Sequence, residues 1–121
     1  MQQNKGKLTE HNAIRVLVQI VKGMKEVRKH GFAHRDLKPE NILIKAGAVK
    51  ICDFGLAVYC KDGSKLLRYC GTPFYMAPQI VWKKYYTSKA DIWSLGTILY
   101  EMIFGYTPWA CRDENSYVQT C

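Results

Sequence analysis

The chain has 121 residues, which is enough for one domain with a single core and too few for two domains of ordinary size. Its 18 lysines and arginines outnumber its 10 aspartates and glutamates, so the formal net charge is +8. This charge suits an acidic partner or simply a solvated basic surface. The lysines are spread along the chain without an aromatic stacking pattern, so we expect no nucleic-acid binding.

The five cysteines are odd in number, include no Cys-x-x-Cys pair and follow no signal peptide. They predict a reduced, cytoplasmic protein without a zinc site. The longest nearly apolar run, residues 92–104, contains Ser94, Thr97 and Glu101 and is too short to cross a bilayer. We therefore expect no membrane insertion.

A long amphipathic helix is predicted to start at Thr9 and to end at Gly31, a natural C-cap. Arg28, Lys29 and His30 occupy its last turn, where positive charge opposes the negative end of the helix dipole, so His30 is expected to cap the helix. Apolar residues recur at spacings of three and four along the helix: Ile14, Leu17, Val21, Met24 and Val27.

Residues 42–44 and 49–51 are predicted to be two strands of an antiparallel hairpin whose turn spans residues 45–48. Continuing this register by one step beyond the strands places Asn41 and Asp53 close together at the open end of the hairpin.

The residues around this open end carry groups suited to phosphoryl transfer. Proteins hold magnesium with oxygen ligands from one or two side chains, completed by phosphates and water, and Asn41 and Asp53 suit that task. Asp36 can accept a proton from an attacking hydroxyl. The ammonium of Lys38 can offset negative charge on a transferring phosphoryl group.

Four segments in this order resemble the signatures of the eukaryotic protein kinase domain, serine/threonine type: residues 34–41 (HRDLKPEN), 53–55 (DFG), 71–78 (GTPFYMAP) and 91–96 (DIWSLG). The resemblance implies a mainly α fold with a small β-hairpin, as in the large, C-terminal lobe of a kinase. It also implies a monomer that uses ATP and Mg²⁺ to phosphorylate Ser/Thr of a protein substrate.

The resemblance assigns roles to further residues. Leu43 matches the residue that touches the adenine ring, and the same leucine can also be part of the core. Thr72 matches the threonine that bridges Asp36 and Lys38, and Thr72 and Lys38 together favour serine/threonine specificity. His34 matches a histidine that packs and forms hydrogen bonds rather than transferring protons.

Residues 53–78 resemble the activation segment, with which Arg35 would interact. In the family this arginine commonly binds a phosphorylated residue. The usual phosphorylated position is Arg68 here, which cannot be phosphorylated. We expect Ser64 to take its place, with Tyr69 as another candidate and Asp62 as a permanent, weaker substitute.

The next helix is predicted to begin at a cap, Thr87 or Ser88, and to stop at Gly105. It is apolar almost all round, so we expect it to be buried. By resemblance, Asp91 accepts hydrogen bonds from the backbone of the catalytic loop. Glu101 is expected to form a salt bridge within the lobe or, alternatively, to meet substrate arginines.

The sequences of residues 75–79 (YMAPQ) and 89–94 (KADIWS) are similar to those of autophagy-initiating kinases, including Gln79 in place of the usual glutamate. The chain contains no Gly-x-Gly-x-x-Gly and nothing that resembles the strand lysine or helix glutamate that orient ATP phosphates. Residues 2–8 resemble an interhelical linker.

We therefore expect residues 1–121 to be a partial kinase domain, with the catalytic loop, metal loop, activation segment and central helix. The small ATP-binding lobe and the final helices would be absent. The alternative is a catalytically inert truncated fragment or a regulatory binding module.

Overall fold

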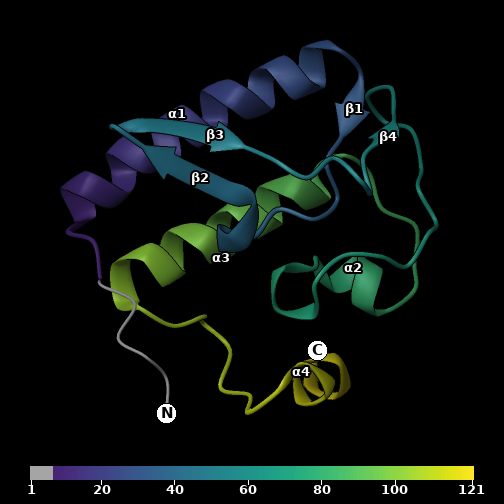
Figure 1. Cartoon of the computed structure of the whole chain (residues 1–121). Coiled ribbons are helices and arrows are strands. Elements are labelled where there is room, and N and C mark those ends of the chain that lie inside the picture. Colours follow the sequence, from purple (N-terminus) through teal and green to yellow (C-terminus); the bar gives the residue numbers. More distant parts are fainter. Residues whose placement is uncertain (1–6) are drawn as a thin grey trace.

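A computed structural model describes residues 7–121, so most of the predicted linker over residues 2–8 lies outside the described residues. The fold is mainly helical with two small antiparallel sheets. A hairpin and two long helices pack together, and the shorter helices lie to one side (Figure 1). In chain order the elements are α1 (Glu10–Lys29), β1 (Phe32–Ala33), η1 (Pro39–Asn41), β2 (Ile42–Lys45), β3 (Ala48–Ile51), β4 (Val58–Tyr59), η2 (Pro73–Tyr75), α2 (Pro78–Val81), α3 (Ala90–Phe104) and α4 (Glu114–Thr120).

Helix α1 has the predicted caps. The Thr9 hydroxyl accepts a hydrogen bond from the backbone N–H of Asn12 at 3.2 Å. Gly31 follows the helix with φ +84°, the left-handed conformation that ends many helices. The His30 ring also bonds the Glu26 carbonyl at 2.8 Å, which confirms its expected capping role.

The hairpin of β2 and β3 has the predicted antiparallel register, and its turn is tighter than predicted. Lys45 already pairs with Ala48, so only Ala46 (φ 50°) and Gly47 (φ 77°) form the loop. Positive φ at both residues is the geometry of a type I′ turn, whose twist matches that of the strands. Strand β3 packs on α1, which fixes the hairpin over the helix.

Arg28 connects the end of α1 to the second sheet. Its guanidinium donates to the carbonyl of Phe32 at 2.9 Å and to that of Cys60 at 3.0 Å, one from each side of the β1–β4 pair. It also forms an ion pair with Asp62. Three contacts of this kind define the position of the chain just after β4.

Helix α3 begins at Ala90 after Lys89, and no side chain caps it, so the expectation of a Thr87 or Ser88 cap was wrong. The helix ends at Gly105 (φ 83°) as predicted. The expectation that the whole helix is buried was wrong: Ile92 is 67% exposed and Trp93 is 38% exposed. Among the described residues, α1 and the segment around η2 cover only one face of α3. The residues buried on that face are largely polar: Asp91, Ser94, Thr97 and Ile98.

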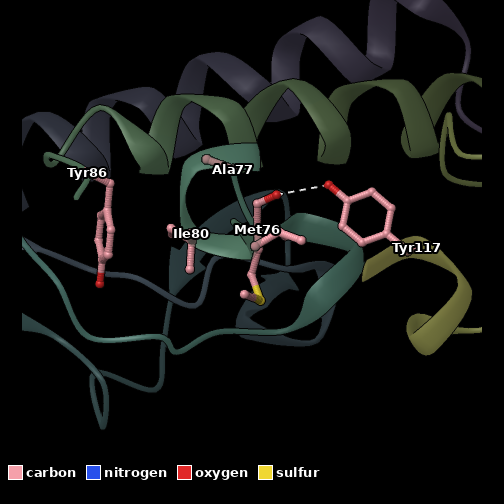
Figure 2. Close-up of a cluster of buried hydrophobic side chains, with 6 residues drawn as sticks. Met76, Ala77, Ile80, Tyr86 and Tyr117 are labelled. Carbon is pink, nitrogen blue, oxygen red and sulfur yellow. Dashed lines mark hydrogen bonds between the residues drawn. The ribbon is translucent and has the colours of Figure 1, made fainter. Parts of the chain in front are cut away.

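The core consists of two clusters of buried side chains. One lies between α1, α3 and the loop before the hairpin, and it contains Ile20, Met24, Leu37, Tyr75 and Ile98. The other joins α2 to α4, as Figure 2 shows, and it contains Met76, Ala77, Ile80, Val81, Tyr86 and Tyr117. There the Tyr117 hydroxyl donates to the Met76 carbonyl at 3.0 Å (Figure 2). Among the described helices, none combines the length and apolar character needed to span a membrane.

Candidate active site

Asp36, Lys38 and Thr72 form one hydrogen-bonded group. The Thr72 hydroxyl donates to Asp36 Oδ1 at 2.8 Å and accepts from Lys38 Nζ at 2.9 Å. Lys38 Nζ also lies 3.6 Å from Asp36 Oδ2. The expected bridge by Thr72 is therefore present. It joins Thr72 to Lys38, 34 positions earlier in the chain, and to Asp36, 36 positions earlier.

The loop that carries Asp36 is held by a buried carboxylate from α3. Asp91 accepts from the backbone N–H of His34 at 2.8 Å and from that of Arg35 at 3.0 Å, as predicted. Burial raises the pKa of Asp91, while these two hydrogen bonds act to lower it. Arg35 has a φ of 69°, so Asp91 stabilises a backbone conformation that a non-glycine residue adopts only at a cost.

His34 is fully buried, and both of its ring nitrogens have partners. Nδ1 accepts from the Asp36 N–H at 3.2 Å, so Nε2 carries the proton that is donated to the Cys52 carbonyl at 3.1 Å. The ring also packs edge-on against Phe54, with 5.0 Å between ring centroids. This geometry suits the packing role expected of His34, because neither nitrogen is left for a substrate.

The predicted metal ligands lie at the same end of the hairpin. The Cys52 N–H donates to the Asn41 carbonyl at 2.9 Å, which continues the ladder to the residue before Asp53. The buried Asn41 amide donates to the Asp36 carbonyl at 2.9 Å, and its Oδ1 has no hydrogen bond to the described residues. Asp53 is exposed, and its Oδ1 accepts from the Gly55 N–H at 3.1 Å. An amide oxygen and a carboxylate are a donor set that fits magnesium.

Leu43 lies on strand β2 and is 55% exposed, so the expectation that it can also be part of the core was wrong. Its neighbour Ile44 is exposed to a similar extent. The hairpin contacts α1 through β3, which leaves apolar side chains of β2 uncovered by the described residues.

The expected partners of Arg35 are arranged differently from the prediction. Asp62 contacts Arg28, so its expected role as a substitute partner for Arg35 was wrong. Ser64 is exposed, and its N–H bonds the Lys61 carbonyl at 3.0 Å in a turn next to Asp62.

Arg35 instead binds neutral groups. Its Nε donates to the Leu56 carbonyl at 2.7 Å, and Nη1 lies 3.4 Å from the Tyr86 hydroxyl. The same hydroxyl donates to the Arg68 carbonyl at 2.6 Å. The sequence did not reveal Tyr86 as a functional residue. Its hydroxyl contacts Arg68, 18 positions earlier, and Arg35, 51 positions earlier, and contacts between such distant residues leave no local sequence pattern.

The segment that follows Thr72 is attached to α3. Ser94 Oγ donates to the Tyr75 carbonyl at 2.6 Å, and the Tyr75 hydroxyl donates to Glu101. Burial and the neighbouring Glu101 carboxylate raise the pKa of Tyr75. The expected salt bridge of Glu101 was wrong, since no lysine or arginine of residues 7–121 forms an ion pair with it. Trp109, which follows α3 in the chain, also contacts this segment: its Nε1–H donates to the Phe74 carbonyl at 2.8 Å.

The loop, hairpin and threonine bridge together match the large lobe of a kinase. The family profile described as the protein kinase domain matches residues 1–121, and the chain belongs to this family. It is 46% identical over 103 residues to the serine/threonine-protein kinase atg1 of Dictyostelium discoideum, covering 82% of this chain and 15% of that protein.

Two further relatives agree with this assignment. The chain is 36% identical over 121 residues to the serine/threonine-protein kinase unc-51 of Caenorhabditis elegans, covering 91% of the chain and 14% of the relative. It is 43% identical over 112 residues to the serine/threonine-protein kinase grp of Drosophila melanogaster, covering 89% of the chain and 22% of that relative. The resemblance to serine/threonine kinases of the autophagy-initiating group is confirmed, and the chain spans less than a quarter of the length of each of these relatives.

Proposed function

We propose that the protein carrying these residues transfers the γ-phosphoryl group of ATP to serine or threonine hydroxyls of protein substrates. The observation that carries the proposal is the contact of Thr72 with both Asp36 and Lys38. Through Thr72, a residue from a distant part of the chain, the Asp36 carboxylate and the Lys38 ammonium of one loop are held together. Phosphoryl transfer depends mainly on positioning and electrostatic stabilisation, which such a group supplies.

In this proposal Asp36 is the base and Lys38 stabilises charge. The substrate hydroxyl gives its proton to the Asp36 carboxylate as its oxygen forms the new bond to phosphorus, and the bond to the ADP oxygen breaks. Thr72 orients the carboxylate by donating to Oδ1. Lys38, already 3.6 Å from Oδ2, offsets the negative charge of the phosphoryl oxygens.

Asn41 and Asp53 would hold Mg²⁺, and Leu43 would offer its exposed apolar surface to the adenine ring. When bound, the ion neutralises phosphate charge. The hydrogen bond from Asn41 Nδ2 to the Asp36 carbonyl orients the amide, so that its oxygen is left available as a ligand.

Two further parts of the proposal concern location and the alternative function. We infer a cytoplasmic location because the five cysteines are free thiols. The alternative is a binding module without catalysis, which the assay below distinguishes from the kinase.

The test is a phosphorylation assay with labelled ATP and Mg²⁺ on the protein expressed from its native transcript. Asp36→Asn should lower kcat by about 10²- to 10⁴-fold, because the base is lost. Asp53→Ala should abolish turnover without unfolding the protein. Glu26→Gln, on an exposed carboxylate of α1 that forms no ion pair with the described residues, is the matched control. Full activity of Asp36→Asn would exclude the mechanism, and an inactive wild type would favour the binding module.

A further inference from the structure

Two segments on the surface run side by side, although they are far apart in the chain. The N–H and carbonyl of Leu66 form reciprocal hydrogen bonds with those of Tyr86, at 2.7 and 2.9 Å. This pairing places residues 65–69 of the activation segment next to residues 82–85. We call their exposed basic and tyrosine side chains the basic aromatic surface, formed by Lys65, Arg68, Tyr69, Lys83, Lys84 and Tyr85, and the exposed Leu67 and Trp82 lie in the same two segments.

The charge of this surface is unbalanced. Between Asp62 and Asp91 the sequence contains no acidic residue, and it contains these cations: Lys65, Arg68, Lys83, Lys84 and Lys89. The ion pairs found among the described residues, Arg28 with Asp62 and Lys38 with Asp36, involve none of the cations in that stretch. A cluster of one sign without internal compensation attracts a partner of the opposite sign.

The lysines are positioned by aromatic rings. Lys65 Nζ lies 4.4 Å from the centroid of the Tyr85 ring, and Lys83 Nζ lies 5.7 Å from that of Tyr69. Lys84 Nζ is similarly 5.4 Å from the Trp82 ring. These cation–π contacts restrict flexible side chains, and they place an ammonium over a face of each ring. A nucleic acid needs free ring faces for base stacking, whereas carboxylates need only the cations, so the arrangement favours an acidic peptide.

The surface also adjoins the candidate active site. Arg68 precedes Thr72 by four residues, so their Cα atoms are at most about 14 Å apart. Thr72 touches Asp36, the proposed base. A substrate whose hydroxyl lies at Asp36 therefore has side chains a few residues away that can reach Arg68.

We propose that the basic aromatic surface binds aspartate and glutamate side chains near the acceptor residue, which makes serine or threonine in an acidic sequence the substrate class. This inference rests on the proposed function for the acceptor, while the binding itself is independent of catalysis. The cations of the surface supply the affinity, and the pairing of Leu66 with Tyr86 sets their spacing.

Binding is tested by fluorescence anisotropy on the whole chain, with a labelled glutamate-rich peptide whose single serine is replaced by alanine. Arg68→Glu combined with Lys84→Glu should weaken binding about tenfold or more, and added salt should weaken binding to the wild type. Lys22→Glu combined with Lys25→Glu, on the exposed face of α1, is the matched control and should bind normally. If charge reversal unfolds the chain, as judged by circular dichroism, Arg68→Ala combined with Lys84→Ala replaces it.

Three results would overturn the inference. The first is equal binding of a glutamine-rich peptide of the same length. The second is an unchanged affinity in the variants of the basic aromatic surface. The third is tighter binding of a single-stranded oligonucleotide, or of vesicles containing phosphatidylserine, than of the acidic peptide.

A second assay separates this inference from the proposed function. The protein expressed from its native transcript should phosphorylate a serine flanked by glutamates faster than one flanked by lysines, and Arg68→Glu with Lys84→Glu should remove that preference. Equal rates on both peptides would refute the acidic specificity and leave the kinase function standing. If no peptide is phosphorylated and the acidic peptide still binds normally, the kinase function is refuted, whereas the binding of acidic side chains by the basic aromatic surface is supported.

Discussion

The guanidinium of Arg35 donates to the hydroxyl of Tyr86 at 3.4 Å, and that hydroxyl in turn donates to the carbonyl of Arg68 at 2.6 Å. Tyr86 is only 4% exposed, so this connection is shielded from solvent. It links the catalytic loop to the activation segment through neutral groups. The arginine before the proposed base therefore has partners in the absence of any phosphate.

We predict that Tyr86→Phe loosens the activation segment without unfolding the chain. Removal of the hydroxyl deprives the Arg68 carbonyl of its donor, which should lower the free energy of unfolding by about 1 kcal/mol. Hydrogen exchange of residues 66–70 should become faster. The matched control is Tyr85→Phe, whose ring is exposed and whose hydroxyl forms no hydrogen bond with the described residues. Equal effects of the two changes would show that Tyr86 acts only through packing.

We predict that Ser64 is the activating phosphorylation site of the native protein. Arg35 brings a positive charge to this region, and a phosphate on the exposed Ser64 would carry nearly two negative charges. Phosphatase treatment, Ser64→Ala and Arg35→Ala should each lower kinase activity. Full activity of Ser64→Ala, with no effect of phosphatase, would show that the Leu56 carbonyl and Tyr86 are sufficient partners for Arg35.

We predict that the Thr72 hydroxyl, rather than the bulk of its side chain, supports activity. Thr72→Val keeps the shape and removes the donor to Asp36 and the acceptor for Lys38, so kcat of the native protein should fall severalfold or more. Thr72→Ser retains the hydroxyl and should keep most of the activity. The kinase assay described above compares the two, and similar losses in both would contradict the positioning role.

We predict opposite pKa shifts for two aspartates. Burial raises the pKa of Asp91 above its ordinary 3.8, whereas the Ser116 N–H lowers that of Asp113. The contribution of Asp91 to stability therefore falls as pH rises from its unfolded to its folded pKa. The contribution of Asp113 is present above its unfolded pKa and is lost as pH falls through its folded pKa. Carboxyl ¹³C shifts followed against pH should show Asp91 titrating above Asp113, and the reverse order would refute both assignments.

We predict that the 121 residues expressed alone have no measurable kinase activity and negligible ATP affinity. The sequence has no glycine-rich loop or strand lysine to orient the phosphates, and positioning supplies most of the catalysis. The measurement is phosphorylation of a generic protein substrate by highly purified chain. Activity that disappears in Asp36→Asn would contradict this expectation.

The sequence by itself determined those features that depend on neighbouring residues. Thr9 and Gly31 predicted the ends of α1, because caps and left-handed glycines act within a single turn. The position of the hairpin followed from strand register alone. The same register pairs Asn41 with Cys52, the residue before the expected Asp53. The contact of Thr72 with Asp36 and Lys38 was also expected, although from the likeness of its motifs to a known family rather than from periodicity.

The tertiary structure decided the features that require distant segments to meet. The role of Tyr86 between Arg35 and Arg68 depends on how the residues before α3 lie against the activation segment. The partner of Arg28 was likewise set by the position of Asp62 after β4. Burial was decided in the same way: α3 is apolar almost all round, yet side chains such as Ile92 remain exposed wherever no described element packs against them. Hydrophobic periodicity tells which side chains gain from burial, whereas the elements packed around a helix determine which of them are buried.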